Sequence, residues 1–213
     1  GIGKSIATYL SSKSEYFVYG SSRNIDKLTD VSFIPIQLDV TSDTSINNCI
    51  DKIIKEHGKI DILINNAGVG ITGPMEETPN DEIEKHFKTN LYGPINLMKK
   101  VLPFMRGNRA GLIINITSIA GHIGTPFRSI YSAGKASLDI ISETLNMETK
   151  EFNVNVVCIA PGDYLTNISK GRFHSPVIKG SPYEHKYKSS LDKMNENITK
   201  GANPIKVARL VHK

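Results

Sequence analysis

The sequence predicts an α/β fold in which a doubly wound parallel sheet (a Rossmann fold) forms a single domain over residues 1–213. Short apolar segments alternate with segments of helix length, the order expected of repeated strand–helix–strand units. Three of the apolar segments run on without polar alternation, as do strands that helices cover on both faces. The chain has no internal repeat, low-complexity tract or linker that would divide it.

Aromatic and branched residues mark the strands, and longer polar segments between them mark the helices. The expected strands are 16–19, 33–38, 60–64, 112–116 and 154–159, and the expected helices are 45–57, 81–105 and 129–152. Asp43 or Thr44 is expected to cap the first of these helices, and Asn80 the second. Right-handed crossovers between parallel strands follow from this order.

Composition excludes several classes of protein. Lys plus Arg minus Asp plus Glu is 26 − 21 = +5, and no run of five like charges is present, which disfavours nucleic-acid binding.

No apolar stretch reaches the roughly 18 residues of a membrane span. Cys49 and Cys158 lie too far apart for a zinc ribbon. The six histidines lack metal-ligand spacing and are expected at the surface or in loops. We expect a soluble cytoplasmic protein without a metal.

Residues 163–201 interrupt the alternation, because they are polar, rich in lysine and carry Gly171, Pro176, Gly180 and Pro182. The segment follows the 154–159 strand, so it lies at the carboxyl end of the sheet, where ligands bind in open α/β folds. We interpret it as a substrate-binding loop. A disordered insertion is the alternative.

The first residues carry a candidate phosphate site. Gly1-Ile2-Gly3 precedes an apolar helical stretch, and glycines at a helix N-terminus let a pyrophosphate approach the backbone. Ser22 and Arg23 lie 19 and 20 residues beyond Gly3, where a dinucleotide fold reads the ribose. Arginine in place of an acidic residue suits a 2′-phosphate, so NADP is favoured over NAD. The alternative is a solvated arginine in a turn.

Asn65-Asn66-Ala67-Gly68 follows the 60–64 strand. Small residues at the end of a strand allow a flat ring or ribose to lie against the backbone. The alternative is an asparagine-rich turn.

Tyr131 and Lys135 lie one helical turn apart on one helix face. A nearby cation favours the phenolate form of tyrosine, and a phenol tuned in this way can exchange a proton with a carbonyl oxygen. Tyr9 and Lys13 share the spacing, so the spacing alone is not diagnostic. Ser118, at the end of the 112–116 strand, distinguishes the Tyr131 pair because its hydroxyl can bind the same oxygen. His122 and Phe127 are candidates to line the pocket.

Taken together, these residues resemble the short-chain dehydrogenase/reductase family, in its single-domain branch. The matching segments occur in family order: Gly1-Ile2-Gly3, Asp39-Val40, Asn65-Asn66-Ala67-Gly68, Asn90-Leu91-Tyr92-Gly93, Ser118, Tyr131 with Lys135, and Pro161-Gly162.

The resemblance implies roles for these residues. In the catalytic tetrad, Tyr131 is the acid/base, Ser118 holds the substrate oxygen, Lys135 binds the nicotinamide ribose, and Asn90 holds a water of a proton relay. Asp39, followed by Val40, meets the adenine. The residues that flank the nicotinamide are Pro161, Gly162 and Thr166.

Two departures from the family pattern lead us to expect that the chain is truncated at both ends. The pattern begins with a further strand, which would lie between the Phe17 and Ile62 strands, so a gap is expected there. The pattern also continues past residue 213.

The implied function is NADP(H)-dependent interconversion of a secondary alcohol and a ketone, with a small-molecule carbonyl or alcohol substrate. The long segment after Pro161 resembles steroid- and retinol-dehydrogenase-like members of the family. The alternatives are a 3-oxoacyl-thioester reductase and a catalytically weak dinucleotide-binding regulator. In the family, the long helices, here 81–105 and 129–152, form the subunit interface, so we expect a homo-oligomer, either a dimer or a tetramer.

Overall fold

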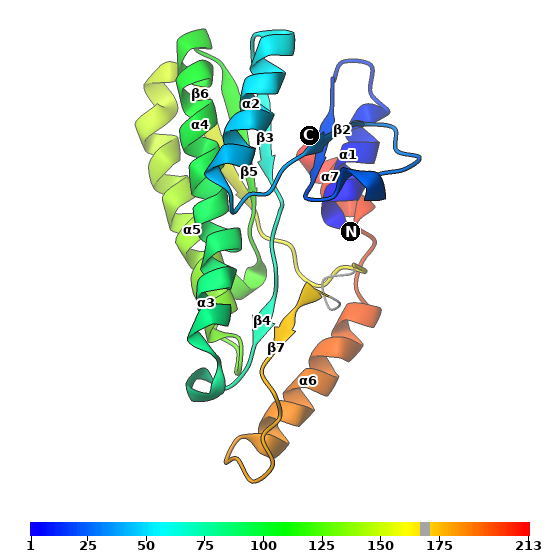
Figure 1. Cartoon of the computed structure of the whole chain (residues 1–213), viewed down its shortest axis with the longest axis vertical. Helices are drawn as coiled ribbons and strands as arrows, with labels where there is room; N and C mark the ends of the chain where they lie inside the picture. The colour runs from blue at the N-terminus through cyan, green and yellow to red at the C-terminus, as the bar shows by residue number, and fades with distance from the viewer. Residues whose placement is uncertain (167–170) are drawn as a thin grey trace.

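The computed structural model describes residues 1–166 and 171–213, and its strands run parallel between layers of helices (Figure 1). Strand β1 (Tyr19–Ser22) pairs with β2 (Ile34–Gln37). Strands β3 (Ile62–Asn65), β5 (Gly111–Ile116) and β6 (Val154–Ile159) form a second sheet in the order β3-β5-β6. The predicted α/β class is confirmed. The first strand begins at Tyr19, three residues later than expected.

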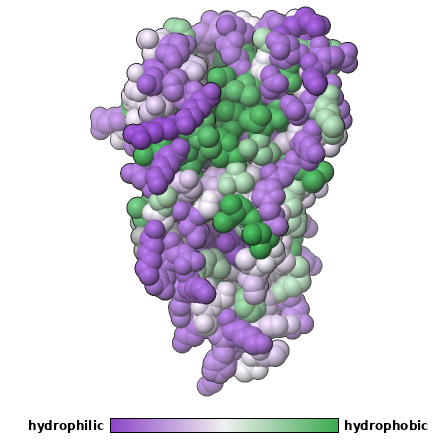
Figure 2. Space-filling view, turned by 180° about the vertical axis from the view of Figure 1, so that it is seen from behind, coloured by the Kyte–Doolittle hydropathy of each residue, from purple (hydrophilic) through white to green (hydrophobic). Residues whose placement is uncertain are grey.

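The parallel sheet is divided rather than continuous. No ladder joins β1 to β3 among the described residues, which is the gap that the sequence predicts between these two strands. Phe17, just before β1, is 83% exposed, and Ile62 at the start of β3 is also exposed. Apolar side chains gather in the upper half of the face seen in Figure 2.

Helices cover both faces of the β3-β5-β6 sheet. On one face, α2 (Asp43–His57), α4 (Gly93–Asn108) and α5 (Ser129–Thr149) pack over a core that includes the fully buried Val101, Met105 and Ile113. On the other face, α1 (Ile2–Ser11) and α7 (Ile205–Val211) contact Ile114 and Ile116. Each such side chain contributes roughly 1.5–3 kcal/mol of burial free energy. The two layers account for the uninterrupted apolar strands.

The predicted 81–105 helix is instead two helices joined by a turn of π-helix. Helix α3 (Asn80–Phe87) leads into the π segment η3 (Lys88–Tyr92), and α4 follows. Asn90 lies inside the π turn, and its amide bonds the backbone of a distant loop. Such turns are frequent at functional sites because they redirect one side chain.

The predicted helix caps were misplaced by one or two residues. Ser42 caps α2 by accepting a hydrogen bond from the Ser45 amide, so Asp43 and Thr44 lie inside the helix. Pro79 precedes α3, and Asn80 is its first helical residue.

No helix among the described residues has the length and apolarity needed to cross a bilayer.

The interpretation of 163–201 as one loop is partly wrong. Strand β7 (Phe173–His174) pairs with β4 (Ile71–Thr72), and α6 (Glu184–Thr199) follows it. Tyr187 anchors α6, since its side chain is 1% exposed and its hydroxyl donates to the carbonyl oxygens of Thr72 and Ser175 at 2.9 and 3.0 Å. Residues 167–170, which the same prediction includes, lie outside the described residues.

Candidate active site

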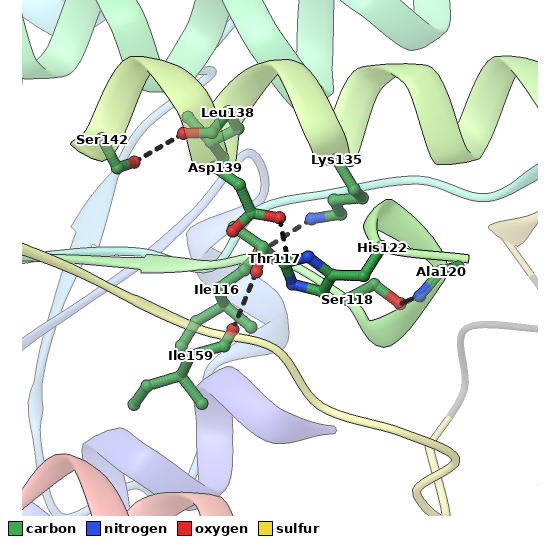
Figure 3. Close-up of polar contacts among 10 residues, drawn as sticks. All are labelled: Ile116, Thr117, Ser118, Ala120, His122, Lys135, Leu138, Asp139, Ser142 and Ile159. Atoms are coloured by element: carbon green, nitrogen blue, oxygen red, sulfur yellow. Dashed lines mark hydrogen bonds and ion pairs between the residues drawn. The ribbon is translucent and has the colours of Figure 1, made fainter. Parts of the chain in front are cut away.

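Helix α5 carries Tyr131 and Lys135 on its buried side, and each is 6% exposed. The Lys135 Nζ donates to the Ile116 carbonyl oxygen at 2.8 Å, where β5 ends (Figure 3). Burial lowers the pKa of Lys135 to about 8, although the nearby Asp139 and Cys158 act in the opposite direction. An amine whose pKa lies this close to neutral pH can lose and regain a proton under ordinary conditions.

Ser118 lies two residues after the end of β5 and caps the short helix η4 (Ile119–Gly121). Its Oγ accepts a hydrogen bond from the Ala120 amide at 3.2 Å. The backbone amide of Ile119 donates to the Pro161 carbonyl oxygen at 3.2 Å. A Cβ on Gly162 would lie 3.6 Å from the Ile119 side chain. The predicted Pro161-Gly162 segment therefore lies beside the predicted serine.

Asn90 meets the loop after β3. Its Oδ1 accepts from the Val69 amide and its Nδ2 donates to the Val69 carbonyl, both at 2.8 Å. A Cβ built on Gly68 would lie 3.4 Å from Asn90 Oδ1 and 3.7 Å from Lys135 Nζ. The asparagine and the lysine therefore meet at one stretch of backbone, the loop after β3.

His86 is a member of this cluster that sequence reasoning missed, and its expected surface location is wrong. It is 1% exposed, its ring nitrogens lie 3.3 Å from Asn90 Nδ2, and its ring centroid is 5.9 Å from that of Tyr131. Burial, reinforced by the charge of Lys135, lowers the pKa of His86 to about 4. The imidazole is therefore neutral at physiological pH. Its spacing of four residues from Asn90 was the available signal.

Asp139 lies one further turn along α5 from Lys135. Its Oδ2 is 3.6 Å from His122 Nε2, and its side chain is 14% exposed (Figure 3). This carboxylate raises the pKa of Lys135 against the effect of burial. His122 contacts this carboxylate. Phe127 packs against Tyr187 with ring centroids 5.2 Å apart.

The glycine loop forms the start of α1, with Gly1 as its N-cap and Ile2 as its first residue. A Cβ on Gly3 would overlap the side-chain amide of Asn66, and one on Gly1 would lie 3.9 Å from Thr166 Cβ. The helix N-terminus, the asparagine loop and the Thr166 segment therefore converge. Because Gly3 has no side chain, the backbone at the start of α1 stays uncovered, which fits the approach of a pyrophosphate.

Arg23 lies near enough to Asp39 for its charge to act on that carboxylate. Hydrogen bonds from the Thr41 amide and hydroxyl lower the pKa of Asp39, and the charge of Arg23 lowers it further. Arg23 and Thr41 line a cavity of about 330 Å³ that extends past Lys88 to His86, Gly70 and Phe173. Tyr131 does not line this cavity. Lys88 is a further basic residue on this cavity, and none of the sequence motifs indicates it.

Three predicted cofactor contacts have other partners. The Ser22 hydroxyl is engaged in a turn with Asn24, and Val40 packs in the core. Asn65 Nδ2 donates to Asn115 Oδ1 at 2.8 Å, although Asn65 Oδ1 is buried without a hydrogen-bond partner. Asn66, Ala67 and Gly68 remain at least partly accessible. No group of three or more metal-ligating side chains occurs in the described part of the chain.

Residues 1–176 match the family model described as short chain dehydrogenase, and the chain belongs to this family. The prediction of an oxidoreductase of this class is therefore confirmed.

Among curated relatives, the chain is 36% identical to 3-ketodihydrosphingosine reductase of Bacteroides thetaiotaomicron, over all of this chain and 79% of that protein. It is 33% identical to human retinol dehydrogenase 8, over 78% of this chain and 56% of the relative. The match to the second relative thus spans little more than half of its length.

Solved structures show the same fold. A short-chain dehydrogenase from Streptomyces avermitilis superposes with a TM-score of 0.88 at 29% identity, over all of this chain and 78% of that one. ElxO with NADP bound superposes with a TM-score of 0.80 at 25% identity, over all of this chain and 86% of that one.

Proposed function

We propose that the protein is an NADP(H)-dependent oxidoreductase that interconverts a secondary alcohol and a ketone. The observation that carries the proposal is a buried cluster of polar side chains: Asn90 and Lys135 meet at Gly68, and His86 lies between Asn90 and Tyr131. Tyr131 packs with Ala120, whose amide donates to Ser118 Oγ. Buried titratable groups at the carboxyl ends of parallel strands are typical of active sites in this class of fold.

In this proposal the cofactor supplies or accepts the hydride at the carbinol carbon. Tyr131 gives a proton to the carbonyl oxygen in reduction and takes it back in oxidation. Ser118 donates a hydrogen bond to the same oxygen, which orients the substrate. Lys135, near its pKa, holds positive charge beside the phenol and binds the nicotinamide ribose.

Asn90 has a positioning role in this scheme. Both polar atoms of its amide are bonded to Val69, so Asn90 holds the Gly68–Val69 backbone against Lys135. The water that the family pattern assigns to Asn90 remains a prediction.

For NADP, the residues to hold the cofactor are present in a consistent arrangement. Gly1 and Gly3 are proposed to admit the pyrophosphate at the N-terminus of α1. Arg23, with Lys88 on the same cavity, is proposed to bind the 2′-phosphate. The NADP bound to the structural relative ElxO supports this choice.

We further propose a homo-oligomer that pairs through α4 and α5. Ile140 and Met147, seven residues apart on α5, are 63% and 65% exposed, an apolar stripe that a second subunit would cover. A monomer by light scattering at micromolar concentration would contradict this.

A fluorescence titration with NADPH and NADH tests the cofactor assignment. We expect NADPH to bind more tightly, and Arg23→Ala to remove the difference by weakening NADPH binding alone. Arg209→Ala, an exposed arginine of α7, is the matched control. Equal affinity for both cofactors would contradict the role of Arg23. If neither binds, the enzyme proposal fails and the regulator alternative replaces it. A carbonyl panel monitored by NADPH oxidation then tests the reaction itself.

A further inference from the structure

Two half-buried arginines, Arg128 and Arg172, lie near Tyr131. The Arg128 guanidinium carbon is 4.7 Å from the centroid of the Tyr131 ring. Arg172 interacts electrostatically with both Arg128 and Tyr131. Its Nη1 donates to the Met194 sulfur at 2.7 Å, which is a weak acceptor. Neither arginine forms an ion pair with another described residue.

Strand β4 holds the two arginines from opposite sides. The Phe127 carbonyl, one residue before Arg128, accepts hydrogen bonds from the Gly73 amide at 3.0 Å and the Thr72 hydroxyl at 2.8 Å. These bonds hold Phe127 at a φ of 63°, a left-handed conformation that is uncommon for a bulky residue. Arg172 directly precedes β7, whose Phe173 pairs with Ile71 of β4. The fold itself, rather than an ion pair, places both arginines beside β4.

Negative charge nearby offsets only part of the electrostatic cost of this arrangement. Burial lowers the pKa of Arg172, and the charge of Arg128 lowers it further, whereas Asp163 and the phenols of Tyr131 and Tyr187 act in the opposite direction. Removing like charges from water carries a cost unless a counter-charge compensates it. Guanidinium groups bind carboxylates and phosphates through two parallel hydrogen bonds, so an anionic ligand would offset that cost.

We propose that Arg128 and Arg172 form a guanidinium pair that binds a carboxylate or phosphate group on the substrate beside Tyr131. The substrate class is then an anionic ketone and the corresponding anionic alcohol. This inference rests on the proposed function, because it assigns the carbonyl of the same molecule to Tyr131.

A matched pair of ketones tests the proposal. The probes are 3-oxooctanoate and methyl 3-oxooctanoate, which share the carbonyl and differ in the negative charge. Dissociation constants are measured on the complex of the full protein with NADP⁺, so that binding is read without turnover. Wild type is compared with Arg128→Gln and Arg172→Gln. The control is Arg106→Gln, since Arg106 lies over the Phe152 ring at 5.8 Å, far along the chain from the site.

We expect wild type and the control to bind the carboxylate more tightly than the ester, by about 10- to 100-fold. Each site variant should lose most of that preference. A wild-type preference for the ester, a preference that survives both substitutions, or no binding of the carboxylate would each overturn the proposal.

The NADPH affinity of the same variants distinguishes substrate binding by the two arginines from cofactor binding. Phosphates of the cofactor are the other anions that the pair could meet, because Gly171 and Phe173, on either side of Arg172, line the cavity that contains Arg23. Loss of NADPH affinity in both site variants with an unchanged carboxylate preference would assign the arginines to the cofactor and overturn the inference. If the ester is reduced but the carboxylate is not bound, the proposed function stands and only this inference fails.

Discussion

Replacing Lys135 by Met is predicted to change the pH dependence of stability in a defined direction. The ammonium is 6% exposed, and its pKa falls from 10.5 to about 8 on folding, chiefly through burial. At 1.36 kcal/mol for each pKa unit, this shift corresponds to a cost of roughly 3 kcal/mol. Methionine has similar length and removes that cost. The substitution also leaves the Ile116 carbonyl without its donor, at a cost of about 1–3 kcal/mol.

The sign follows from proton linkage. Below pH 8 lysine is protonated in both the folded and the unfolded chain, so the full cost is present. Between pH 8 and 10.5 the unfolded chain binds more protons than the folded one, and stability rises with pH. Relative to the Lys135→Met variant, wild type should therefore gain about 3 kcal/mol between pH 7 and pH 11.

Urea unfolding followed by circular dichroism at several pH values between 7 and 11 measures this difference. Lys150→Met, at an exposed lysine just after α5, provides the control, and its difference from wild type should stay nearly constant. A constant difference for Lys135→Met as well would refute the reasoning, because it would mean that the folded chain does not disfavour the ammonium.

Three further predictions concern the surroundings of the site. His86→Gln should lose less stability in acid than wild type, as measured by urea unfolding. The pKa of His86 falls to about 4 on folding, so the unfolded wild-type chain takes up this proton before the folded chain does. Between pH 6.5 and 4 this difference lowers the free energy of unfolding of wild type by roughly 3 kcal/mol. Gly3→Ala should weaken NADPH binding at least tenfold in a fluorescence titration, because its Cβ overlaps the Asn66 amide, whereas a Cβ on Gly107 meets nothing within 4 Å and Gly107→Ala should have no effect. Tyr187→Phe should lower the free energy of unfolding by about 1–3 kcal/mol, since two carbonyl groups lose their donor.

Each of these has a clear contrary result. Equal loss of stability on acidification in wild type and the His86 variant would show that this imidazole is not the group that resists protonation. Unchanged affinity after Gly3→Ala would mean that the cofactor does not approach the start of α1. A Tyr187→Phe variant as stable as wild type would show that the hydroxyl does not anchor α6.

The parts of the fold that depend on local pattern were predictable. Strand 154–159 was predicted to the residue, because a short segment rich in valine and isoleucine that ends before Pro161 favours a strand. Tyr131 and Lys135 follow from helical spacing, and Ser118 from its place after a strand. Where several strands end at one edge of a sheet, their chain order alone brings such residues together.

The parts that depend on distant contacts were not predictable. His86 is buried because Gly134, 48 residues away on α5, has no side chain, and a Cβ there would lie 2.9 Å from the imidazole. The π turn at Asn90 depends on the Val69 backbone. The polar sequence of α6 predicts a loop, whereas the helix is held by Tyr187, whose hydroxyl bonds a strand more than 100 residues earlier.

The most direct test of the central claim is the turnover of Tyr131→Phe, measured as NADPH oxidation with a ketone that wild type reduces. We expect turnover to fall by at least a hundredfold while NADPH affinity stays within about twofold, because phenylalanine keeps the ring and removes only the hydroxyl that is assigned to proton transfer. Tyr92→Phe, at an exposed tyrosine, should match wild type. Turnover by Tyr131→Phe at the wild-type rate would contradict the assignment of the acid/base.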